Sequence, residues 1–442
     1  MAILGIILAH LIMLIKLKFT AWPEMLLWPY LMIQGWMPYK DIAIAHTPLL
    51  LFDLSIFYKL FGVGIIQLKV YTWILILLTD YLIYWVSKEL WNKKVGIAAA
   101  LIFSFWNLFF DGNGLWFDLG LAPLGLLIFY FLEKKRYLLA GIIFLLSIMT
   151  KQTAFWFLFP ILFSLLASDD KNVNKFYGFA RGALITFLIF FIGLYIFGIQ
   201  RNFIEWAVVF GILELPRASG QIQLPGIKNL IIASFPFVIL LLTFVSKIKN
   251  KWIILSWALF ASLGAYPRFE YFHFQPALPF LAIGSGLVLQ NYKKKNTYTK
   301  FFIVLYTIGS IYLFANFFVR NYGEGTRFYE KNVIEISSYI QSNTEPKDKI
   351  FVLNYWDNIY TLSETLPATS PWFPQLSWYV DSPSVQHEII NDLENSKPKI
   401  ILFNPYTSSG LSSYKPQIVY DYVLTHYRIK EKINGLEVLI LK

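Results

Sequence analysis

The chain has 442 residues, of which 57% are hydrophobic, 19% aromatic and only 15% charged, and its formal net charge at pH 7 is +11. This composition excludes a water-soluble globular protein. Because the Lys and Arg residues lie in short clusters between apolar runs, nucleic acid is not an expected partner. The absence of cysteine excludes disulfides, thiolate chemistry and cysteine-bound metals. The first apolar run, residues 2–15, has no basic region before it, so we expect a retained helix rather than a cleaved signal peptide.

Apolar segments long enough for a membrane follow one another along the chain. A hydrocarbon core of roughly 30 Å needs about 20 mostly apolar residues per helix, and the helix pairs every backbone polar group within one segment. The sequence predicts an α-helical polytopic membrane protein with about eleven transmembrane helices. They are expected at residues 2–15, 64–87, 95–110, 115–132, 137–149, 153–168, 177–198, 228–246, 252–265, 271–290 and 301–319.

The charges of the loops predict the orientation of these helices. Loops rich in Lys and Arg mark the cytoplasmic side of a membrane protein. The clusters are Lys88, Lys93 and Lys94; Lys134, Lys135 and Arg136; Lys171, Lys175 and Arg181; Lys247, Lys249 and Lys251; and Lys293, Lys294, Lys295 and Lys300. They alternate with connections poorer in basic residues, at 111–114, 150–153, 200–226 and 266–270. We therefore expect a multi-pass protein of the cell membrane with a cytoplasmic N-terminus and an extracytoplasmic C-terminal region.

Two segments depart from the pattern of spanning helices. Residues 47–61 are apolar but include Asp53 and Lys59, which favours an interfacial helix. From Gly323 onward the composition becomes that of a soluble protein. Expected strands at 349–353, 399–403 and 436–441 alternate with expected helices at 328–340 and 385–394. The sequence thus predicts a membrane domain at residues 1–322 and a small α/β domain at 323–442.

Charged residues gather at the ends of the helices that are predicted to lie outside. They are Glu24, Asp41 and His46 in the first outer loop, which spans residues 16–63, Asp111 and Asp118 at the second, Lys151 at the third, and Arg268, Glu270 and His273 at the last short one. Charge in an apolar chain is costly and therefore indicates function. Carboxylates beside cations suit transfer of a group from a phosphate to a hydroxyl or amine. One carboxylate would act as general base, and the cations would hold the phosphate charge.

Other interpretations of these residues remain open. A charged residue at a helix end is often solvated or anchors the helix at the membrane interface. We favour the functional interpretation for Asp41, Lys151 and Arg268. A transporter or flippase of an anionic lipid-linked glycan would also need cations in a membrane cavity, but such proteins often contain repeated halves, and none is visible here. A receptor would explain the C-terminal domain but not this set of charges.

Three regions of the sequence carry a family resemblance. They are EMLLWPY at 24–30 with GWMPYKD at 35–41 and HTP at 46–48; YLLAG at 137–141 before TKQT at 150–153; and RFEYFH at 268–273 with Pro276 and Pro279. In this order, and all on the predicted outer side, they resemble the GT-C superfamily of polyprenyl-phosphate-sugar glycosyltransferases. The resemblance is to its branch of protein O-mannosyltransferases and aminoarabinose transferases, whose members commonly have an Asp-Glu pair where this chain has Pro23 and Glu24.

The resemblance implies an inverting enzyme that moves a sugar from a polyprenyl-phosphate donor to an extracytoplasmic protein, lipid or glycan. It implies that the acceptor base is Asp41 or Glu24, and that the donor phosphate is bound by Lys151, Arg268 and His273. Asp118 and His46 would belong to an acceptor or metal site. No cofactor is implied with certainty; a divalent metal is compatible with these carboxylates, although no metal-ligand spacing stands out. The absence of a glycine-rich phosphate loop agrees with a lipid donor.

Overall fold

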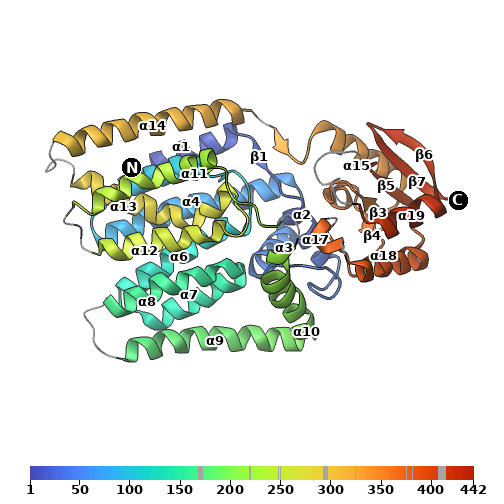
Figure 1. Cartoon of the computed structure of the whole chain (residues 1–442), viewed down its shortest axis with the longest axis horizontal. Coiled ribbons are helices and arrows are strands. Elements are labelled where there is room, and N and C mark those ends of the chain that lie inside the picture. Colours follow the sequence, from blue (N-terminus) through green and yellow to red (C-terminus); the bar gives the residue numbers. More distant parts are fainter. Residues whose placement is uncertain are drawn as a thin grey trace.

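The protein, represented by a computed structural model, consists of a helical bundle and a C-terminal sheet that lies beyond one end of the bundle (Figure 1). The structure describes residues 1–167, 173–218, 221–246, 248, 250–291, 297–323, 325–374, 376–380, 382–406 and 415–442. Several residues of the basic clusters lie outside the described residues: Lys171, Lys247, Lys249 and Lys293 to Lys295.

Each of the eleven predicted spans contains an observed helix. The helices are α1 (Ala2–Lys16), α4 (Ile65–Leu90), α5 (Lys93–Phe109), α6 (Phe117–Glu133), α7 (Tyr137–Thr150), α8 (Leu158–Ala167), α9 (Asn174–Ile196), α11 (Ile227–Ser234), α12 (Lys251–Ser262), α13 (Leu278–Gln290) and α14 (Thr297–Asn321). Short 3-10 helices extend four of them: η1 (Gln152–Phe157), η4 (Phe235–Thr243), η5 (Leu263–Ala265) and η6 (Tyr271–Ala277). By length and composition, four of the described helices could cross a membrane: Ile65–Leu90, Asn174–Ile196, Tyr271–Gln290 and Thr297–Asn321.

Helices in the centre of the bundle are more buried than helices at its edges. The central helix α13 packs against α5 and is buried almost throughout. By contrast, α14 and α9 run along opposite edges of the bundle in Figure 1 and expose large apolar side chains such as Ile189 and Ile311. Between α7 and α9, a Cβ added to Gly141 would lie 2.0 Å from the Phe179 carbonyl oxygen, so only glycine permits this close approach. The exposed apolar edges require lipid as their solvent.

The first long loop folds into two helices between the bundle and the C-terminal sheet (Figure 1). One of them, α3 (Leu49–Phe61), occupies the segment predicted as an interfacial helix. The other, α2 (Glu24–Ile33), was not predicted. Its residues 25–31 are all buried, so it shows no amphipathic period, and it contains Pro29, which normally argues against a helix interior. The connection after α9 is also helical, with α10 (Gln200–Phe203), the π-helix η2 (Ile204–Glu214) and η3 (Leu215–Arg217).

The C-terminal sheet has five strands in the order β4-β3-β5-β7-β6. The strands are β3 (Lys349–Leu353), β4 (Leu366–Pro367), β5 (Ile400–Phe403), β6 (Tyr427–Ile433) and β7 (Leu436–Leu441). The first three strands of this order are parallel, and the β5-β7-β6 part is antiparallel. The helices around it are α15 (Lys331–Asn343), α16 (Asn358–Leu362), α17 (Ser377–Val380), α18 (Pro383–Ser396) and α19 (Gln417–His426). The three predicted strands and both predicted helices are therefore present.

Strand β6 was missed because five successive residues after Tyr427 are exposed and it has no apolar run. A signal was nevertheless available. Asn434 and Gly435 both have positive φ, 51° and 85°, and join β6 to β7. An Asn-Gly pair is a strong indication of a two-residue hairpin turn.

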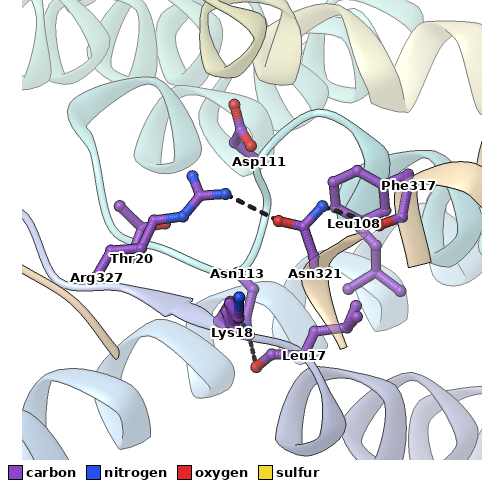
Figure 2. Close-up of a pocket in the computed structure, with 9 residues that line it drawn as sticks. All are labelled: Leu17, Lys18, Thr20, Leu108, Asp111, Asn113, Phe317, Asn321 and Arg327. Atoms are coloured by element: carbon purple, nitrogen blue, oxygen red, sulfur yellow. Dashed lines mark hydrogen bonds between the residues drawn. The ribbon is translucent and has the colours of Figure 1, made fainter. Parts of the chain in front are cut away.

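The N-terminal end of the bundle is joined to the start of the C-terminal domain by a short parallel pair. Strand β1 (Phe19–Thr20) pairs with β2 (Thr326–Arg327). Figure 2 shows a small pocket beside this pair, lined in part by Asp111, Asn113, Asn321 and Arg327. The Asn113 amide donates to the carbonyl oxygens of Leu14, Leu17 and Lys18 at 2.9, 3.0 and 3.1 Å. The Arg327 guanidinium donates to the side chain of Asn321 at 2.8 Å. The bonds of Asn113 fix the C-terminal end of α1 against the connection between α5 and α6.

Asp111 makes the stability of this junction dependent on pH. Burial raises its pKa to about 6, although the positive charge of Arg327 opposes the shift. A carboxyl whose folded pKa is raised favours the folded state when protonated, so this stability is lost as pH rises from about 4 through 6. We expect Asp111→Asn to raise the melting temperature of the detergent-solubilised protein at pH 8 by roughly 1–2 °C, the scale of about 1 kcal/mol, and to leave it unchanged at pH 4.

Asparagine tolerates the left-handed backbone that Asp111 adopts, with φ of 52°, so the substitution introduces no strain. Asp421→Asn is the control, because Asp421 lies on the exposed surface of α19 and its carboxylate bonds only to Gln417 among the described residues. A lower melting temperature for Asp111→Asn at pH 8 would show that the ionised carboxylate stabilises the junction through Arg327.

Candidate functional site

A cavity of about 530 Å³ lies where the bundle, the first loop and the C-terminal domain meet. Its polar and charged lining comes from segments that are far apart in sequence: Glu24, His46, Lys151, Gln152, Thr153, Gln221, Arg268, Glu270, His273, Tyr355 and Asp357. Its aromatic lining is Trp22, Trp28, Trp116, Tyr266, Phe272, Phe328, Tyr355, Trp356 and Tyr379. Aromatic walls with a few convergent polar groups are typical of sites that bind small molecules.

Three buried residues form a cluster of opposite charges at one wall of the cavity. The Lys151 ammonium lies 2.5 Å from Asp118 Oδ2 and 3.1 Å from His273 Nδ1, and His273 Nδ1 lies 3.0 Å from the same oxygen. Lys151 is 4% exposed, Asp118 0% and His273 8%. Lys151 follows the last turn of α7 in extended backbone, whereas Asp118 lies in the first turn of α6 and His273 in η6. Asp118 therefore holds the ammonium at the cavity wall.

Arg268 and Glu270 lie at the rim of the same cavity. Arg268 Nε lies 3.8 Å from Glu270 Oε1, and both side chains are about a third exposed, at 31% and 38%. The chain here is held in extended form by Gln223: its N–H donates to the Pro267 carbonyl at 3.1 Å, and its carbonyl accepts from Phe269 N–H at 2.8 Å. The partial exposure of Arg268 leaves its guanidinium accessible to an anion in the cavity, for which its planar donor group is suited.

His46 also lines the cavity, but it is not a cation there. Burial lowers its pKa to about 3, and the positive charge of Lys151 acts in the same direction. Its ring packs against Phe117 and Trp116, with ring centroids 4.6 and 5.8 Å apart. His46 therefore offers a neutral ring to the cavity and cannot neutralise a phosphate at physiological pH.

The two candidate bases of the first loop lie in different surroundings. Glu24 is the first residue of α2 and lines the cavity, with one buried carboxylate oxygen that has no partner in the described structure. Burial raises its pKa above the usual value. Asp41 does not line the cavity. Its carboxylate accepts from Met37 N–H at 2.8 Å, and its carbonyl accepts from Trp372 N–H at 2.9 Å, so it closes a turn against the C-terminal domain.

The structure thus brings together Glu24, His46, Lys151, Arg268 and His273 in one cavity, with Asp118 bonded to two of them, and places Asp41 elsewhere. The cavity lining also includes residues that we did not single out, among them Tyr355, Trp356 and Asp357 of the C-terminal domain. A signal existed, because these three follow the buried parallel strand β3 after one residue, and ligands often bind beyond the carboxyl ends of parallel strands.

The aromatic residues form a continuous wall from the first loop to the C-terminal domain. The Trp22 ring centroid lies 5.5 Å from Trp116, 5.7 Å from Phe272 and 5.1 Å from Phe328. Phe328 in turn lies 4.9 Å from Trp356. Such rings offer flat apolar surfaces and can pack against the C–H faces of a sugar.

In the described part of the chain, no group of three or more His, Asp or Glu residues is arranged to hold a metal ion. Asp118, one of the two candidates, is instead bonded to Lys151 and His273.

Comparisons with known proteins give a family match over part of the chain and a similar fold over nearly all of it. Residues 45–196 match the family model described as dolichyl-phosphate-mannose-protein mannosyltransferase. The fold is similar to that of ArnT from Cupriavidus metallidurans bound to undecaprenyl phosphate, with a TM-score of 0.66 and 11% identity over 99% of this chain and 97% of that chain. It is also similar to the archaeal oligosaccharyltransferase AglB from Archaeoglobus fulgidus in complex with an inhibitory peptide and a dolichol-phosphate. There the TM-score is 0.57 and the identity 12%, over 90% of this chain and 69% of that chain. No curated protein matches the sequence significantly.

Proposed function

We propose that this chain, whose resemblance to the GT-C superfamily is confirmed by the family match and by the shared fold, is an integral-membrane glycosyltransferase with a polyprenyl-phosphate-linked sugar as donor. The observation that carries the proposal is the cavity, in which Lys151 and Arg268 accompany the carboxyl of Glu24. The solved relatives were bound to undecaprenyl phosphate and to dolichol-phosphate, and both ligands carry the phosphate that such a cavity would hold.

The residues of the cavity support a single displacement at the anomeric carbon. Glu24 takes the proton of the acceptor hydroxyl or amine, and the freed electron pair forms the bond to the anomeric carbon. The bond from that carbon to the phosphate oxygen breaks, and the polyprenyl phosphate leaves with its electron pair. Lys151 and Arg268 stabilise the negative charge that grows on the phosphate, and His273 supports Lys151. Attack opposite the departing phosphate inverts the configuration of the sugar.

The arrangement of the loops supports the topology of about eleven spans with the active site outside. Positions from the first outer loop and from the four later connections predicted as extracytoplasmic meet at the C-terminal domain. Asp111 lies beside Arg327, and Glu24, Lys151, Gln221 and Arg268 line the cavity. Two of the connections predicted as cytoplasmic also lie together. The Asn250 side-chain amide, beside the cluster at Lys251, donates to the Glu133 carboxylate, beside the cluster at Lys134, at 2.7 Å. We infer that the C-terminal domain and the cavity are extracytoplasmic and that the N-terminus is cytoplasmic.

Transfer from a panel of radiolabelled polyprenyl-phosphate monosaccharides tests the proposal. The purified protein in lipid nanodiscs is incubated with each donor and with a membrane extract as the source of acceptors. We expect one donor to label a product and undecaprenyl phosphate to be released in equal amount. If no donor is consumed, the transferase proposal fails, and translocation of lipid-linked glycans by reconstituted vesicles would be measured instead.

A further inference from the structure

The C-terminal domain contributes directly to the cavity. The loop that leaves β3 carries Tyr355, Trp356 and Asp357 and leads into α16, which packs against α2. Because Glu24 begins α2, this packing brings the loop to the carboxyl that we propose as the base. Both carboxyls line the cavity, and burial followed by the negative charge of Glu24 raises the pKa of Asp357 well above its usual value.

This part of the cavity contains several polar atoms that lack a partner. Among the described residues, no hydrogen bond is made by Glu24 Oε2, Trp28 Nε1, Tyr355 Oη or Asp357 Oδ1, and each of these atoms is inaccessible to solvent outside the protein. Leaving a buried polar group unpaired costs about 1–3 kcal/mol, and native proteins rarely tolerate several together. All four residues line the cavity, so a ligand there would satisfy these atoms.

The charged residues of the cavity differ in their pairing. Lys151 and Arg268 are each paired with a carboxylate, Asp118 and Glu270, whereas Glu24 and Asp357 are two carboxyls without a paired cation among the described residues. Two neighbouring buried carboxyls carry no more than about one negative charge between them at neutral pH, because ionisation of one opposes that of the other. Such a pair accepts a hydrogen bond with one group, donates one with the other, and repels a phosphate.

We propose that Tyr355, Trp356 and Asp357 of the C-terminal domain form, together with Glu24, the acceptor subsite of the enzyme, and that this subsite takes an uncharged, hydroxyl-rich sugar. The inference rests on the proposed glycosyltransferase function. Trp356 continues the aromatic wall through Phe328 and offers a surface for the C–H face of a sugar ring. The unpaired groups include both donors and acceptors, as the hydroxyls of a sugar require.

Binding of uncharged sugars tests the subsite without knowledge of the natural acceptor. Methyl α-mannoside, methyl β-galactoside and methyl β-glucoside are titrated against the full-length protein in nanodiscs by saturation-transfer NMR, beside glucuronic acid and a Ser/Thr peptide. We expect Asp357→Asn and Tyr355→Phe each to weaken binding of the best methyl glycoside at least tenfold, equivalent to about 1.4 kcal/mol. The affinity for undecaprenyl phosphate should change less than twofold. Asp421→Asn is the matched control, the same substitution at an exposed site of the same domain.

The outcomes separate this inference from the proposed function. Unchanged glycoside binding in both variants would overturn the subsite, and an equal loss of undecaprenyl phosphate affinity would assign these residues to the donor instead. Stronger binding of glucuronic acid or of the peptide would overturn the chemical class. If the wild type consumes no donor but binds glycosides in an Asp357-dependent manner, the transferase function fails and the sugar site stands. Tyr355→Phe removes a single oxygen atom, so it still tests the subsite if Asp357→Asn does not fold.

Discussion

Lys151→Met is expected to reduce sugar transfer at least 10²–10³-fold and to destabilise the protein at the same time. The loss of activity follows from removal of the ammonium that stabilises the departing phosphate, since one preorganised donor of this kind contributes about 10²–10³ in rate. The loss of stability follows from Asp118, which is 0% exposed and would keep its charge beside only His273. Breaking a buried ion pair by removal of one partner costs about 3–5 kcal/mol.

A double variant separates these two effects. In Lys151→Met with Asp118→Asn both charges of the pair are gone, and replacement of a whole buried ion pair is often close to neutral for stability. We expect thermal unfolding to return towards that of the wild type, while transfer and binding of undecaprenyl phosphate remain lost. Recovery of transfer in the double variant would mean that Lys151 serves only to neutralise Asp118 and that the phosphate is bound elsewhere.

Glu24→Gln is expected to lower kcat about 10²–10⁴-fold with little change in stability or in affinity for undecaprenyl phosphate. The amide keeps the size of the side chain but cannot take a proton from the acceptor. Because burial raises the pKa of Glu24, the wild-type rate should fall as pH is lowered through that raised pKa, where the base becomes protonated. The residual rate of the Gln variant should lack this decline, and a pH profile of kcat/KM between pH 4.5 and 8 measures both.

Asp41→Asn is the matched comparison, because it makes the same chemical change at the other candidate base. An asparagine can still accept from Met37 N–H through its amide oxygen, so we expect transfer within about threefold of wild type and a loss of stability below about 1 kcal/mol. The reverse pattern, with Glu24→Gln active and Asp41→Asn inactive in a folded protein, would move the base to Asp41.

Most of the helices and three strands of the C-terminal domain could be predicted because their burial follows from local sequence. Residues 349–353 and 436–441 are apolar runs that become buried strands, and the spans follow from hydropathy. Helix α2 could not be found in this way. It is buried on all sides by the bundle and the C-terminal domain, and that environment is created by distant parts of the chain.

The residues of the candidate site likewise include some that could be predicted from the sequence and some that could not. Loop charges and helix parity predicted that Lys151, Arg268 and His273 would lie at one end of the bundle, where all three line the cavity. Neither rule distinguishes between two carboxylates of a single loop, so Glu24 and Asp41 could not be separated before the loop was seen folded. Asp357 enters the cavity through packing of α16 on α2, and more than 300 residues separate Glu24 from Asp357.

The pairing of β1 with β2 has a consequence for the biogenesis of the protein. Phe19 lies opposite Thr326, so the first loop cannot take its final form until the ribosome has passed that residue. At about 5–20 residues per second, this delay is roughly 15–60 s. During that interval Glu24 lacks the cavity lining that the C-terminal domain provides. On the proposed function, a nascent chain would therefore stay inactive until β2 has been made and has paired with β1.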